Sequence, residues 1–131
     1  MDVQYDKSLD ILVVEVTGEL SASVYDQAID AVLKSPSFRA NINVIYDLRS
    51  AKGLSLSAEQ IRTVAARAKS SAGVRGTSWK AAIVVSGILE YGLGRMFEFF
   101  NEDAPYKVRV FRSMEEAQTW VAENDSSKVR Q

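Results

Sequence analysis

The polar residues best placed to do chemistry are those at the predicted carboxyl ends of parallel strands. They are Asp47, Arg49, Ser86 and Arg112. Ligands of such sheets bind outside this edge, and a helix that begins after Ser86 could hold an anion through its free N–H groups. The loop lacks the repeated glycines of a phosphate cradle, however. Asp47 and Arg49, two residues apart, could equally form a surface ion pair worth at most about 1 kcal/mol. The sequence therefore leaves two interpretations of these residues, a polar loop and an anion-binding site.

A catalytic centre is harder to find. The chain has no cysteine and no histidine, which excludes thiol nucleophiles, thiolate metal sites and the commonest general base. The pair Glu115–Glu116 begins a predicted helix, and Glu116 is expected to form a capping box with Ser113, which leaves it unavailable for catalysis. Glu102 and Asp103 follow a predicted helix without an implied cleft. We assign no catalytic residue, no metal and no cofactor, and expect the protein not to be an enzyme.

Composition indicates one ordinary domain. The 131 residues are 47% hydrophobic and carry a net charge of −1, which provides no field for gathering nucleic acid. No window approaches the ~18 apolar residues of a membrane span, and the start does not look like a secretory signal. We expect a domain over residues 1–123, a flexible tail over 124–131, a cytoplasmic location and no stable membrane insertion.

Hydrophobic periodicity predicts the order ββαβαβαβα, an α/β architecture. The first two strands should form an antiparallel hairpin, and the next strand should run parallel to the second after a helical crossover. Serines at 21, 57 and 113 are predicted N-caps. Residues 70–79 are predicted to be an exposed connection. The predicted strands are 2–6, 11–16, 42–47, 81–85 and 106–111, and the predicted helices follow the three capping serines and span about 88–101.

The helix over residues 88–101 has an unusually wide apolar side. At ~100° per residue, about half its circumference is apolar, which is more than one packed face needs. The apolar positions are Ile88, Leu89, Gly92, Leu93, Met96, Phe97, Phe99 and Phe100, and the other half holds Glu90, Tyr91, Gly94, Arg95, Glu98 and Asn101. We predict that Leu93, Phe97 and Phe100 have no place on the sheet. The candidates for an interface or an apolar ligand are Leu89, Leu93, Met96, Phe97 and Phe100; alternatively these side chains are simply core.

Four segments, in this order, resemble the STAS superfamily, and more closely the bacterial SpoIIAA-like domains that are grouped with lipid-binding domains of the CRAL-TRIO type. The resemblance covers residues 2 to about 123 and implies a mixed five-stranded sheet with helices packed on it. The segments are Ile11-Leu-Val-Val-Glu-Val-Thr-Gly18, Val44-Ile-Tyr-Asp-Leu-Arg49, Tyr91-Gly-Leu-Gly-Arg-Met-Phe97 and Tyr106-Lys-Val-Arg-Val-Phe-Arg112.

The resemblance also implies functions. Antagonists of anti-sigma factors carry a phosphorylatable serine where Ser57 stands, but the aspartate and glycine of their Asp-Ser-Ser-Gly motif are missing here. The N-cap role already explains Ser57. We therefore expect a regulatory interaction module, homodimeric through the helix 88–101, whose partner could also be another regulatory protein. The alternative is a carrier or sensor of a small apolar or lipid ligand in a cleft beside that helix.

Overall fold

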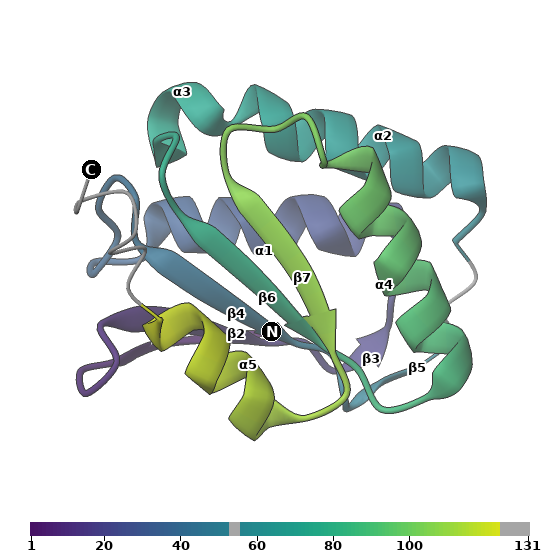
Figure 1. Ribbon diagram of the computed structural model, residues 1–131, viewed down its shortest axis with the longest axis horizontal. Coiled ribbons are helices and arrows are strands. Elements are labelled where there is room, and N and C mark those ends of the chain that lie inside the picture. Colours follow the sequence, from purple (N-terminus) through teal and green to yellow (C-terminus); the bar gives the residue numbers. More distant parts are fainter. Residues whose placement is uncertain (53–55, 124–131) are drawn as a thin grey trace.

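Five short strands rich in β-branched residues form one mixed sheet (Figure 1). The computed structural model describes residues 1–52 and 56–123, except the side chain of Leu89. The order across the sheet is β1-β2-β4-β6-β7. β1 is antiparallel to β2, and all other neighbours are parallel. The bounds are β1 Asp2–Asp6, β2 Ile11–Glu15, β4 Asn43–Asp47, β6 Lys80–Val84 and β7 Lys107–Phe111.

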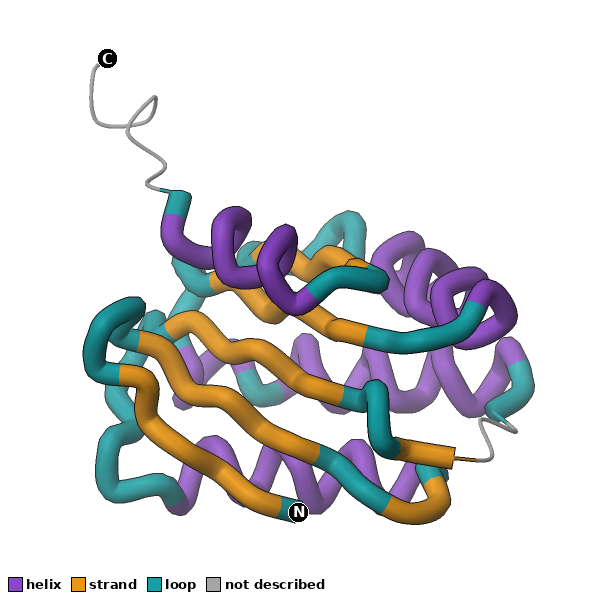
Figure 2. Tube along the Cα trace, turned by 90° about the horizontal axis from the view of Figure 1, so that it is seen from below, coloured by secondary structure: helices purple, strands orange, loops and turns teal. Residues whose placement is uncertain are grey.

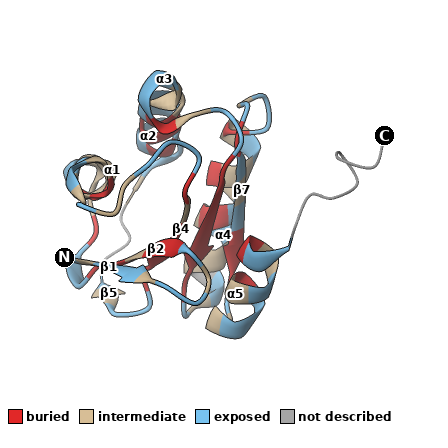
Figure 3. Ribbon diagram, turned by 90° about the vertical axis from the view of Figure 1, so that its left-hand side faces the viewer, coloured by how far each residue is buried: buried red, intermediate tan, exposed pale blue. Residues whose placement is uncertain are grey.

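Helices cover the two faces of the sheet unequally. The core on one face is covered by α1, α2 and α4, while α5 lies alone on the other face (Figure 2). The bounds are α1 Ala22–Lys34, α2 Ala58–Ser70, α3 Ala72–Arg75, α4 Ile88–Phe100 and α5 Met114–Ala122. Every residue of β6 is buried because helices cover this central strand on both sides (Figure 3).

The mixed sheet and the element order confirm the predicted fold class. The three capping serines are also confirmed: Ser21, Ser57 and Ser113 each accept a hydrogen bond from a backbone N–H in the first turn. At Ser57 the capping box is complete, because Gln60 Oε1 accepts from the Ser57 N–H at 2.8 Å. These local signals hold because capping depends on neighbours within one turn.

Two features depart from the prediction. A short parallel pair, β3 (Gly18–Glu19) with β5 (Ala51–Lys52), lies beside the main sheet, and residues 72–75 form the helix α3. The connection 70–79 is not fully exposed, since both Arg75 and Trp79 are buried. Trp79 stacks on Tyr106 with ring centroids 4.2 Å apart. Local periodicity cannot predict the contact between Trp79 and Tyr106, because the two residues are far apart in the sequence.

The tail predicted over residues 124–131 lies outside the described residues, so the predicted domain boundary stays a prediction. Among the helices of the described chain, none combines the length and the apolar character that a bilayer crossing requires.

Candidate functional site

The orientation of α4 decides which of its side chains are available. Its buried stripe is Gly94, Phe97 and Asn101, spaced i, i+3, i+7, so the helix turns this side to the core. Gly94 permits the close approach: a Cβ at this position would lie 2.4 Å from Cγ2 of Val110 in β7. Gly94 and Asn101 had been placed on the outer half of the helix. The sheet-facing side is thus rotated away from the most apolar side.

Phe97, predicted to have no place on the sheet and offered as an interface candidate, belongs to the core. Phe97 is only 8% exposed, and its ring centroid lies 5.7 Å from that of Tyr25 in α1. Leu93, Met96 and Phe100 are half-buried and pack against the same core. They find a place because α2 lies beside α4 on the same face, with the Arg62 guanidinium 5.0 Å from the centre of the Phe100 ring. The candidate Leu89 has its side chain outside the described atoms.

The apolar residues left over on α4 are Ile88 and Phe99. They are 76% and 65% exposed, and they share a solvent-facing stripe with Gly92 and Arg95 at spacing i, i+4, i+7, i+11. Both belonged to the wide apolar side read from the sequence. Their exposure could not be read there because periodicity does not say which way a helix is turned.

Phe99 also borders a groove of about 480 Å³ along the outer edge of β7. The residues that line it carry charges of both signs, namely Arg95, Lys107, Arg109, Glu98 and Glu102, and Arg95 Nη1 donates a hydrogen bond to Glu98 Oε1 at 2.9 Å. The strand edge is partly closed, because Glu98 Oε2 accepts a hydrogen bond from the Val110 N–H at 2.6 Å. Such a carboxylate occupies a donor that another strand would need for pairing.

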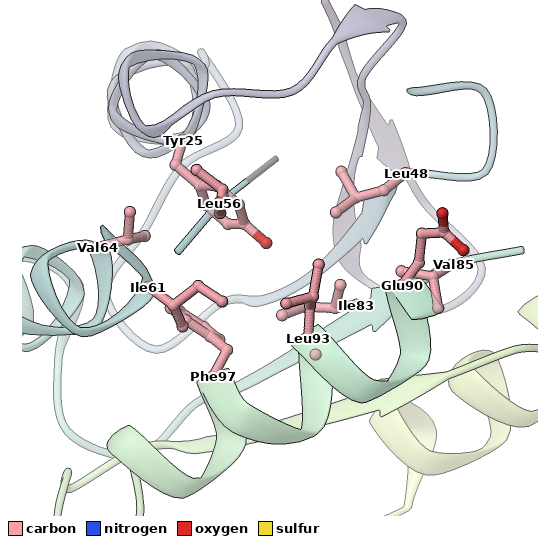
Figure 4. Close-up of a pocket in the computed structure, with 11 residues that line it drawn as sticks. Tyr25, Leu48, Leu56, Ile61, Val64, Ile83, Val85, Glu90, Leu93 and Phe97 are labelled. Atoms are coloured by element: carbon pink, nitrogen blue, oxygen red, sulfur yellow. The ribbon is translucent and has the colours of Figure 1, made fainter. Parts of the chain in front are cut away.

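Under α4 the structure has a small cavity in place of a cleft (Figure 4). It measures about 20 Å³, room for roughly one water-sized atom. Its walls come from the core face of α1, α2, α4 and the sheet, and include Tyr25, Leu56, Leu93 and Phe97. Burial raises the pKa of the Tyr25 phenol far above its usual range, so this hydroxyl keeps its proton. The space as it stands does not hold a lipid.

A second cavity, also of about 20 Å³, lies against Arg75. It shares three wall residues with the first, namely Tyr25, Ile83 and Phe97. Arg75 was not a candidate from the sequence. A single arginine between Val74 and Gly76 in an expected loop carries no signal of burial.

The polar strand-end residues do not form one cluster. Asp47 is 7% exposed, and both its carboxylate oxygens accept hydrogen bonds of 2.9 Å from the Arg49 side chain. The Arg49 guanidinium thereby holds the pKa of Asp47 below its usual value. Ser86 and Arg112 are exposed at the same edge and make no hydrogen bond or ion pair within the described residues. Asp47 and Arg49 therefore satisfy each other's hydrogen-bonding groups, which corresponds to the ion pair in a polar loop and not to an anion site.

Ser57 is exposed at the start of α2, with its oxygen engaged by the Gln60 N–H at 3.1 Å. The cap role is confirmed, and phosphorylation stays a prediction. Residues 53–55, directly upstream of this region, lie outside the described structure. Among the described residues no group of three or more Asp or Glu side chains is arranged to hold a metal ion.

Comparison with known proteins identifies the family. The SpoIIAA-like family model matches residues 11–122, nearly the whole described chain. A crystal structure of an uncharacterised protein of the DUF3478 family from Shewanella loihica PV-4, with a SpoIIAA-like fold, is similar at 20% identity. The match covers 92% of this chain and 90% of that one, with a TM-score of 0.56. No curated protein matches. The chain belongs to the SpoIIAA-like family, within the STAS superfamily.

Proposed function

We propose that this SpoIIAA-like domain is a non-enzymatic interaction module that forms a homodimer through the outer face of α4 and the groove beside β7. The observation that carries the proposal is Phe99, a large aromatic residue 65% exposed at the rim of that groove. Its ring makes an edge contact with Phe100 at 5.7 Å, which restrains it on the surface. Aromatic anchors of this kind are enriched at the centres of interfaces.

The charges of the groove favour a second copy as the occupant. A two-fold interface places the same patch on both subunits, so it needs charges of both signs. The groove supplies them: Lys107 and Arg109 lie on β7, and Glu98 and Glu102 lie at the end of α4. Because Glu98 already occupies the Val110 N–H, we propose contact through side chains and not through a continuous sheet.

The test is sedimentation velocity over a hundredfold range of concentration. Phe99→Asp should shift a dimer to monomer, because a carboxylate would be buried without a partner. The matched control is Val74→Asp on α3, which is 62% exposed and does not line the groove. A wild-type protein that stays monomeric at high concentration, or a Phe99→Asp protein that dimerises like Val74→Asp, would contradict the proposal. Phe97→Asp is unsuitable, since this residue is core.

A second candidate function is the carriage of a small apolar ligand. The observation that favours it is the pair of neighbouring cavities between α1, α2, α4 and the sheet, which share walls at Tyr25 and Phe97. Displacement of these two rings would join the cavities into one apolar space. Native mass spectrometry of the purified protein should then show a bound apolar compound, and repeated spectra of ligand-free protein would argue against carriage.

A further inference from the structure

The least satisfied group in the described structure is a buried cation. Arg75 ends α3 and is only 3% exposed. Its Nη1 donates a hydrogen bond of 3.2 Å to the Tyr46 hydroxyl, and its guanidinium carbon lies 3.7 Å from the centre of the Trp79 ring. Its Nη2 is buried and has no hydrogen-bond acceptor among the described residues. The guanidinium therefore has an aromatic platform and one neutral acceptor, but no carboxylate.

Such an arrangement is unfavourable by itself. A buried ion needs an opposite charge or a full set of hydrogen bonds to offset the loss of its hydration. The stacking of Arg75 on Trp79 recovers part of this, and Trp79 is in turn fixed by its stack on Tyr106. The backbone is fixed as well, because the Arg75 carbonyl accepts from the Asn41 N–H at 2.7 Å. The side chain is thus held in place while Nη2 remains available to an acceptor.

The surroundings of Arg75 indicate what kind of acceptor would fit. The adjacent cavity of about 20 Å³ has room for roughly one atom, such as a single oxygen. Beyond it the walls are mainly apolar and include Ile29, Ile83 and Phe97. The cavity under α4 has Tyr25 and Phe97 as wall residues in common with this one, and the two rings form a tilted pair with centroids 5.7 Å apart. A cation therefore lies at one end of a potential apolar channel.

We propose that Arg75 is the recognition group for the carboxylate of a small acid with an apolar body. This inference rests on the carrier function proposed above and specifies its ligand class. The planar fork of a guanidinium matches a carboxylate, and hydrogen bonds to a charged acceptor are stronger than those to a neutral one. The body of the acid takes the space opened when the rings of Tyr25 and Phe97 move apart.

Three compounds that separate the carboxylate from the apolar body test the proposal by isothermal titration calorimetry on the full chain. Octanoate carries the carboxylate and the apolar body, 1-octanol has the body without the charge, and acetate has the charge without the body. Octanoate should bind at least about tenfold more tightly than 1-octanol, in line with a hydrogen bond to a charged group, and more tightly than acetate. Equal affinity for octanoate and acetate would refute a role for the apolar body.

Variants test whether Arg75 causes the preference for octanoate over 1-octanol. Arg75→Met should abolish the preference for octanoate over 1-octanol while retaining the volume of the side chain. The control is Arg62→Met, which removes an exposed arginine that also stacks on an aromatic ring, at 5.0 Å from Phe100. Persistence of the preference in Arg75→Met, or its equal loss in Arg62→Met, would overturn the inference.

The wild-type protein gives a readout that does not depend on folding of the variants. Octanoate should shift the NMR signal of the Trp79 indole N–H, which donates to the Gly76 carbonyl at 2.8 Å, and should leave that of Trp120 unchanged. Equal binding of octanoate and 1-octanol would leave carriage intact and remove the role of Arg75. If neither octanoate nor 1-octanol binds, both the carrier function and the role of Arg75 are refuted.

Discussion

The contact between Gly94 and β7 gives the sharpest test of how α4 is placed. In Gly94→Ala the added Cβ would lie 2.4 Å from Cγ2 and 2.8 Å from Cβ of Val110, so the helix or the strand must shift. Overpacking of this kind costs about 1–3 kcal/mol. Against it stands the better helix propensity of alanine, about 1 kcal/mol. The net effect on the free energy of unfolding should lie between about zero and a loss of 2 kcal/mol.

Gly92 provides the matched control in the same helix. It is exposed, and a Cβ built there meets nothing within 4 Å. Gly92→Ala should therefore stabilise by about 1 kcal/mol. Because the propensity gain is common to both variants, the difference between them isolates the overpacking cost of about 1–3 kcal/mol.

Urea denaturation followed by circular dichroism measures this difference. For a slope near 2 kcal/mol/M, the midpoints of the two variants should differ by about 1 M. A second check is the background Val110→Ala, which removes the clashing Cγ atoms and should reduce the cost of Gly94→Ala. Equal midpoints for the two glycine variants would refute the placement of α4 on β7 through Gly94.

Three further predictions concern the other sites. Phe97→Ala should lower the free energy of unfolding by about 3–5 kcal/mol through loss of a buried ring. Phe99→Ala should change the unfolding free energy of the monomer by less than about 0.5 kcal/mol. Thermal unfolding at low protein concentration compares the two variants, and equal losses would contradict the assigned burial. Since Asp47 has a lowered pKa in the folded state, its stabilisation by Arg49 is present above about pH 4, the usual value for Asp, and is lost as the pH falls through the folded pKa. The stability gap between wild type and Arg49→Met, about 1 kcal/mol at pH 7 because Arg49 is half-exposed, should narrow in urea titrations as the pH falls below about 4. A gap that stays constant over the whole acid range would exclude the ion pair. Ser57→Ala should lose about 1 kcal/mol through its cap, and a phosphate-dependent mobility shift that survives this substitution would exclude Ser57 as a phosphorylation site.

Much of the fold follows from local patterns in the chain. In β7, Val108 and Val110 alternate with Lys107 and Arg109; charges on the outer face are typical of a strand near a sheet edge, and β7 is an edge strand of the sheet. In α2 the spacing i, i+3, i+4, i+7 of small and apolar residues indicates one buried face, and these residues are the buried ones: Ile61, Val64, Ala65 and Ala68. These features depend on period and on neighbours within one turn, both of which are written in the sequence.

The candidate site depended on relations that no local pattern contains. Periodicity fixes the angles between side chains on α4, but not the rotation of the helix against the sheet. That rotation is set by the close approach at Gly94 and by α2 on the same face, so Phe97 is buried and Phe99 is exposed. The burial of Arg75 likewise depends on Trp79 and Tyr106, which come together only when β6 and β7 pair. The sequence alone determined the five strands of the main sheet, the four long helices and their order; the packing of distant elements decided the short elements β3, β5 and α3 and which side chains are available.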